Sequence, residues 1–272
     1  MIARLAGCIC VAALLTAAPA AQVDSAGLNA QSTVRALAVL GPRVAGTATE
    51  RRAAAVVSAR FGKLGLTPVV QTVPVPRGGA SRNLVFRTGG APLRAIVVAH
   101  LDGVSAGPAA NDNGSGVGAL LEVARLLRNR PGMLYAALGA EERVMTGSRL
   151  HLGSARLLRS LGGADRRSTR LVLSLDMVGY GPTLNIRGLE SRPNRSALIA
   201  LAAARRLGLT ASYLQDRGQS DHEEFTRGGI PGAWVEWRWD PCWHTACDRV
   251  GRVRPEKLSA AIRLAVASVR AA

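Results

Sequence analysis

Short runs of apolar residues alternate with amphipathic segments along this chain. The runs 95–99, 133–140 and 171–175 have the length and side-chain type of buried strands, whereas residues 117–127 carry apolar side chains at helical spacing. Strands that alternate with helices are typical of α/β proteins with a mostly parallel sheet. The pattern therefore predicts a three-layer αβα sandwich.

Cap and turn residues place the expected elements more closely. Helices are predicted over residues 32–40, 49–64, 116–129, 147–161, 196–207 and 255–271, and strands over residues 67–76, 83–87, 93–99, 133–138, 170–176, 183–187 and 232–237. Residues 22–29 are interpreted as a short polar leader, and residues 77–80 as a turn. Because the sequence contains no internal repeat and no linker, residues 22–272 are expected to form one domain.

The first residues have the pattern of a signal peptide. Arg4 supplies a positive charge, residues 5–17 are apolar, and Ala18-Pro19-Ala20 forms a small-residue cleavage site. The apolar run is too short for a comfortable membrane span. We therefore predict a cleaved signal peptide over residues 1–21 and a secreted or periplasmic protein.

The chain is strongly basic, with a formal net charge of +17 over 272 residues. The basic residues are scattered, and no basic cluster is interleaved with aromatic residues, so a nucleic-acid partner is not expected. The charge predicts weak electrostatic association with an anionic cell envelope. An arginine-rich composition that only reflects the base composition of the genome is the alternative interpretation.

Two cysteines remain after removal of the leader, Cys242 and Cys247, and they flank His244. A disulfide is the expected state of such a pair in an exported protein. It would staple the loop that carries the histidine. A thiolate metal site is the weaker alternative, because no second cysteine pair is present elsewhere.

Histidines and carboxylates follow the predicted strands at the points where the strands end. The residues are His100, Asp102, Asp112, Glu141, Glu142, Asp176 and His244. Each residue alone has an ordinary structural explanation, such as a helix cap or a solvated pair. Ligands bind at the carboxyl ends of strands in open α/β sheets, and imidazole with carboxylate suits a divalent metal. The gathering of so many of these groups predicts a metal site.

A hydrolase that uses two zinc ions needs a bridging carboxylate, terminal ligands on each side, a carboxylate base and groups that orient the imidazoles. The chain offers these parts as Asp112 for the bridge, His100 with Asp176 for one ion, Glu142 with His244 for the other, Glu141 for the base and Asp102 for orientation of His100.

These residues lie in motifs that resemble the M28 family of zinc peptidases, in particular its small secreted bacterial aminopeptidases. The motifs are residues 100–103, 110–116, 141–142, 175–179, 220–222 with 229–231, and His244-Thr245 with Asp248. The resemblance covers about residues 30–270. It implies the same ligand, base and orienting roles, two zinc ions, and a peptide substrate with a free amino terminus held partly by carboxylates of the site.

Two positions depart from the family pattern. Trp243 stands where a tyrosine often helps to hold an oxyanion, and Val144 stands where a glycine is usual, which would reshape the substrate pocket. Trp239 or Trp243 is a candidate wall of that pocket, against strand packing as the alternative. Asp221-His222 either lines the active site or caps the helix that carries Phe225.

Other functions stay open at this level. Glutaminyl cyclases share the fold and use one zinc ion for acyl transfer, but the complete second ligand set argues against them. Carboxypeptidase and dipeptidase variants of the family are a further alternative. A non-catalytic binding module would be expected to lack ligands, and this chain keeps every one.

Overall fold

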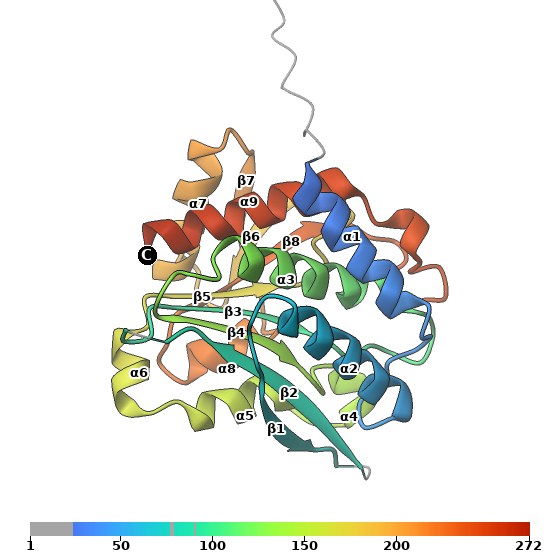
Figure 1. Ribbon diagram of the computed structural model, residues 1–272. Helices are drawn as coiled ribbons and strands as arrows, with labels where there is room; N and C mark the ends of the chain where they lie inside the picture. The colour runs from blue at the N-terminus through green and yellow to red at the C-terminus, as the bar shows by residue number, and fades with distance from the viewer. Residues whose placement is uncertain (1–23, 77–78, 90) are drawn as a thin grey trace, which may run out of the picture.

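An eight-stranded sheet lies between two layers of helices in the computed structural model, which describes residues 24–76, 79–89 and 91–272 (Figure 1). The strands are β1 (Val69–Pro74), β2 (Ala80–Arg87), β3 (Ala95–His100), β4 (Met133–Leu138), β5 (Leu171–Leu175), β6 (Thr183–Gly188), β7 (Ala211–Gln215) and β8 (Gly232–Arg238). Their order in the sheet is β1-β2-β4-β3-β5-β8-β6-β7. The pairs β3–β4, β3–β5, β5–β8 and β6–β7 are parallel. The predicted α/β sandwich with a mostly parallel sheet is confirmed.

The helices cover both faces of the sheet. They are α1 (Ser25–Ala38), α2 (Ala48–Gly62), α3 (Gly116–Leu126), α4 (Arg143–Thr146), α5 (Leu152–Ser160), α6 (Gly163–Ser168), α7 (Arg195–Arg206), α8 (His222–Arg227) and α9 (Pro255–Ala271), with a π-helical turn at Ala110–Ser115 and a 3-10 turn at Val250–Arg252. The larger core lies under α1, α2, α3, α7 and α9, and a smaller core lies under α5 and α8 on the opposite face (Figure 1).

The middle of the sheet is fully enclosed. Every residue of β3, β4 and β5 is buried, which fits their continuous apolar sequences. Helix α3 follows β3 and begins close to the end of β5. A Cβ on Gly116, the first residue of α3, would lie 2.0 Å from the carbonyl oxygen of Leu175. This close approach brings the start of α3 to the carboxyl ends of the central strands.

Two helical predictions were wrong at their starts. The first helix begins at Ser25 and not at residue 32, because Asp24 caps it by accepting a hydrogen bond from the Gly27 N–H at 2.9 Å. Packing of α1 against α9 stabilises the polar first turns that the sequence pattern assigned to a leader. The helix predicted over 147–161 begins at Leu152, and a separate short helix, α4, precedes it.

The sequence pattern predicted neither strand β7 nor helix α6. Strand β7 and helix α6 are short, and β7 alternates only weakly along its five residues. The predicted signal peptide, residues 1–21, lies outside the described residues. Within the residues that are described, no helix combines the length and apolar character needed to cross a membrane.

Candidate metal centre

The predicted ligands converge at one edge of the sheet. His100 ends β3, Asp176 follows β5 directly, and Glu141 with Glu142 follows β4. Asp112 lies in the turn before α3, where the Asp112–Asn113 peptide bond is cis. Parallel neighbours β4, β3 and β5 present their carboxyl ends together, so the topology itself gathers these side chains.

Asp112 lies between two histidines and gives one oxygen to each. Its Oδ1 lies 3.2 Å from His100 Nε2, and its Oδ2 lies 3.3 Å from His244 Nε2. His100 Nε2 also lies 3.4 Å from Asp176 Oδ1. His244 Nε2 lies 3.0 Å from Glu142 Oε2. The structure thus brings together the two predicted ligand pairs on opposite sides of the predicted bridge.

The buried carboxylates and the His244 imidazole of this cluster have shifted pKa values. Burial alone would raise the pKa of Asp112, but hydrogen bonds from His100 and His244 lower it. Burial and the charge of Asp112 raise the pKa of Glu142 to about 8. Burial would lower the pKa of His244, whereas Asp112 and Glu142 raise it to about 10. Positive charge close to these buried carboxylates stabilises them, and divalent ions would supply such charge.

The donor set fits zinc. Atoms of His100, Asp112 and Glu142 that could bind a metal lie within 4.8 Å of one another, as do those of His100, Glu141 and Asp176. Glu142 Oε1 and Asp176 Oδ1 are buried and lack a hydrogen-bond partner in the described part of the chain. Imidazole nitrogens and carboxylate oxygens are ordinary zinc ligands. Such orphaned oxygens are the atoms that a metal would satisfy.

Asp102 supports the loop that carries the two glutamates. Its oxygens accept hydrogen bonds from the backbone N–H groups of Glu141 and Glu142, at 3.0 and 3.2 Å. Its Oδ1 lies 3.8 Å from His100 Nδ1, which is longer than a hydrogen bond. Asp102 thus bonds directly to the segment that carries the two glutamates and lies too far from His100, the residue it was predicted to orient, for a hydrogen bond.

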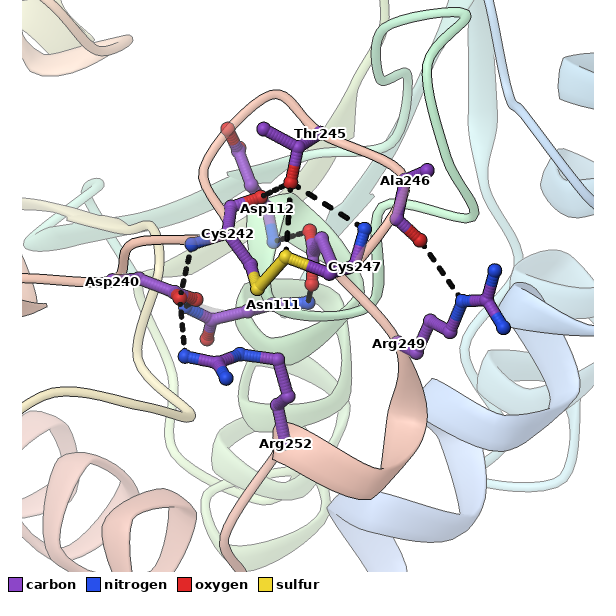
Figure 2. The surroundings of a disulfide bond; sticks show 10 residues. Asn111, Asp112, Asp240, Cys242, Thr245, Ala246, Cys247, Arg249 and Arg252 are labelled. Carbon is purple, nitrogen blue, oxygen red and sulfur yellow. Dashed lines mark hydrogen bonds and ion pairs between the residues drawn. A yellow bond between two sulfur atoms is a disulfide. The ribbon is translucent and has the colours of Figure 1, made fainter.

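The loop after β8 wraps around Asp112, the predicted bridge (Figure 2). Cys242 and Cys247 form a disulfide, as predicted. Asp248 accepts hydrogen bonds from the backbone N–H groups of Asn111 and Asp112, at 2.6 and 3.0 Å. Asp240 accepts from the Asn111 side chain at 2.9 Å. The segment that carries His244 thus also fixes the backbone of Asp112.

Sequence reasoning gave these supporting residues no role. Asp248 appeared in a motif, and Asp240 was not singled out at all. A third is Arg43, which is fully buried and donates to the carbonyl oxygens of Leu101, Pro108 and Ala109 at 2.7–2.9 Å. A charged residue within a short loop that contains glycine or cysteine is the sequence feature that could have identified these residues.

A cleft of about 510 Å³ opens over the cluster and is lined by the predicted ligands and by Glu141. Trp239 and Trp243 both line it, 65% and 51% exposed, and Trp243 stacks on His244 with ring centroids 4.3 Å apart. Both candidate wall residues are therefore in place, and Val144 lines the same cleft. The cleft has the size of a site for a small ligand or a peptide end.

The pair Asp221-His222 lies at the start of α8. Asp221 occupies the N-cap position, but its side chain makes no capping hydrogen bond. Neither residue lines the cleft. His222 is fully buried, with Nε2 3.0 Å from Asp216 Oδ2. The pair is thus part of the packing beside the site.

With the geometry established, comparisons place the chain among known proteins. Residues 83–269 match the model of peptidase family M28, and the chain belongs to this family. Aminopeptidase YwaD of Bacillus subtilis (strain 168) is 32% identical over an alignment of 186 positions that covers 64% of this chain and 40% of that protein. The probable lipoprotein aminopeptidase LpqL of Mycobacterium tuberculosis is 35% identical over an alignment of 191 positions that covers 62% of this chain and 37% of that protein.

The chain spans about 40% of the length of these curated relatives. Among solved structures, BSAP, a zinc aminopeptidase from Bacillus subtilis, superposes with a TM-score of 0.80 at 20% identity, covering 92% of this chain and 96% of that one. A glutaminyl cyclase from Bacteroides thetaiotaomicron gives a TM-score of 0.79 at 22% identity, covering 91% and 98%. At such identities the likeness concerns the fold, which is that of zinc exopeptidases.

Proposed function

We propose that this chain is an exported metallo-aminopeptidase that binds two zinc ions and releases the first residue of peptides. The observation that carries the proposal is the position of Asp112, whose two oxygens each face a different histidine–carboxylate pair. One ion would be held by His100 and Asp176, the other by Glu142 and His244, with Asp112 between them. Membership of family M28 supports the proposal.

When bound, zinc would polarise the substrate carbonyl and lower the pKa of a coordinated water. Glu141, next to the ligand Glu142, would take a proton at its Oε2 and return it to the leaving amine, since its Oε1 lies 3.0 Å from the His151 ring. The cleft carboxylates would attract the ammonium group of a free amino terminus. Trp239 and Trp243 would flank the substrate and reduce access of water.

The test is an assay of residues 22–272 on leucine p-nitroanilide and on its N-acetylated form, each with and without a chelator. We expect cleavage of the free-amine substrate only, loss of activity with chelator, and recovery with zinc. Metal analysis should find two zinc ions per chain. Hydrolysis of the acetylated form, or none in the zinc-loaded protein, would contradict the proposal.

The role of Glu141 is tested by Glu141→Gln, which should retain zinc and lower kcat by about 100-fold or more. Glu122→Gln is the matched control, because Glu122 is also buried but lies on α3 and pairs with Arg125. Full activity of Glu141→Gln would remove the assigned role.

Glutaminyl cyclization is the second candidate, favoured by structural neighbours that are glutaminyl cyclases. A peptide that begins with glutamine distinguishes the two reactions. Ammonia release without a free amino acid indicates cyclization, whereas release of glutamine indicates hydrolysis. A single bound zinc ion would favour the cyclase.

A further inference from the structure

His151 lines the cleft and lies against the side chain of Glu141. Its Nδ1 is 3.0 Å from Glu141 Oε1 and 3.1 Å from the Glu141 backbone oxygen. The ring is 2% exposed and follows the short helix α4. A hydrogen on Nδ1 can therefore be donated only toward Glu141, to its carboxylate and its carbonyl.

Residues of helix α8 contact His151 on the side away from Glu141. Its Nε2 lies 3.3 Å from Glu223 Oε2, and Glu223 is in turn paired with Arg143 and, at 2.7 Å, with Arg227 Nε. The backbone N–H of His151 donates to Glu224 Oε1 at 3.0 Å. Helix α8 thus fixes both the backbone and the ring of His151, which leaves the imidazole little freedom to turn.

We propose that His151 is a positioning residue that locks the carboxylate of Glu141 by donating Nδ1–H to Oε1. This inference rests on the proposed function for the role of Glu141 as a base. A glutamate side chain has three rotatable bonds, and misplacement of a reacting group by about 1 Å can cost about 100-fold in rate. One oxygen held by His151 leaves Oε2 as the atom that exchanges a proton.

A purely structural role for His151 makes a different prediction. In that case the ring fills space and offsets the charges of Glu141, Asp221 and Glu223, and its loss would lower stability without a specific effect on turnover. The two roles separate when hydrogen-bond donation is removed while side-chain volume is kept, and when donation is restored by another group.

The kinetic experiment compares His151→Leu with His151→Asn in the zinc-loaded protein. Leucine has a similar size without a donor, whereas the asparagine amide can donate from nearly the position of Nδ1. We expect His151→Leu to lower kcat about 10- to 100-fold with KM within about threefold and an unchanged zinc content, and His151→Asn to recover most of the loss. Equal losses in both variants, or full activity in His151→Leu, would overturn the proposal.

A second experiment does not depend on turnover. In protein labelled with ¹⁵N-histidine, His151 should give a slowly exchanging Nδ1–H resonance, assigned by its absence in His151→Asn. Glu141→Gln should shift this resonance, and Glu122→Gln should leave it in place. An unmoved resonance in Glu141→Gln overturns the proposal. If the wild-type protein cleaves no peptide but the resonance shifts in Glu141→Gln, the aminopeptidase proposal fails, whereas the hydrogen bond from His151 to Glu141 is supported.

Discussion

The two histidines that face Asp112 are held in different ways. His100 is the last residue of a central strand and is 1% exposed, so the sheet and the main core fix it. The side chain of His244 is 28% exposed and lies on a loop that is closed by the Cys242–Cys247 disulfide (Figure 2) and tied to Asp112 through Asp248. One half of the site is thus maintained by the whole fold, and the other by local bonds.

This difference indicates that the position of His100 is hard to change and that the position of His244 is easier to change. A ligand on a buried strand end cannot move without disturbing the core. A ligand on a loop depends on a few bonds that can be cut one at a time. The following experiments ask whether the two halves respond as differently as their surroundings suggest.

The largest effect is expected for His100→Ala compared with His244→Ala. Without His100, Asp112 and Asp176 lie buried with one cation fewer, and the metal-free protein should lose about 3 kcal/mol of stability. His244→Ala should cost less than about 1 kcal/mol, because its surroundings are partly solvated. Urea unfolding of the chelated proteins measures both values. Equal losses would contradict the division into a core half and a loop half.

A second prediction concerns the pH dependence of stability on the His100 side of the site, where the buried Glu50 lies within the electrostatic influence of Asp102. Glu50 is fully buried, and burial together with the charge of Asp102 raises its pKa from 4.5 to about 7. The folded state keeps this proton to higher pH than the unfolded chain, so stability is greatest below about pH 4.5 and falls as the pH rises to about 7. The loss should be about 3 kcal/mol.

The variant Glu50→Gln, which cannot ionise, should remove this part of the pH dependence. The measurement is the free energy of unfolding from pH 4.5 to 8, with Glu122→Gln as a control for the replacement of another buried carboxylate. Parallel curves for wild type and Glu50→Gln would show that Glu50 titrates normally.

Removal of the disulfide tests the loop half. The double variant Cys242→Ser with Cys247→Ser opens a short loop and should lower stability by about 2 kcal/mol. Because the same loop carries His244 and Asp248, zinc affinity should fall about tenfold. Zinc competition with a chromogenic chelator measures this, and reduction of the wild-type protein should reproduce it. Unchanged zinc affinity would mean that Asp240 and Asp248 hold the loop without the disulfide.

The smallest effect is expected for Trp243, whose ring stacks on His244. Trp243→Ala should weaken zinc binding by about 1 kcal/mol, and Trp243→Phe should retain most of the affinity. Trp239→Ala is the matched control, since Trp239 lines the same cleft but stacks under Arg238. If all three variants bind zinc equally, the stacking does not contribute to the position of His244.

Four of the predicted metal-site residues, His100, Glu141, Glu142 and Asp176, could be placed at one edge of the sheet because each ends or follows a strand that its own sequence defines. Residues 95–99 and 171–175 are apolar and β-branched or leucine-rich, so they form buried strands wherever they lie, and the polar residue that follows each is placed at its end. The side-by-side position of β3, β4 and β5 then needs only the parallel topology that alternating strands and helices favour. The disulfide was predictable for a similar reason, because its two cysteines are close in sequence.

The contact between His151 and Glu141 could not be predicted in this way. The apolar spacing of residues 147–161 fits one continuous helix, which would have placed His151 within its first turns. In the structure α5 begins only at Leu152, and His151 at its N-cap position turns its ring to Glu141. The break depends on α8, whose Glu224 accepts the His151 N–H from 73 residues away in the sequence.

The sequence by itself determined the fold class, most of the strands and the disulfide, and it predicted a set of metal-site residues, because hydrophobic periodicity and short-range spacing are local properties. The tertiary structure alone decided which oxygen of Asp112 faces which histidine, that Asp102 bonds to the glutamate segment, that Asp248 bonds to the backbone of Asp112, and that His151 contacts Glu141. Those contacts join segments far apart in the chain, and they form only when packing of the core brings the segments within a few ångströms of one another.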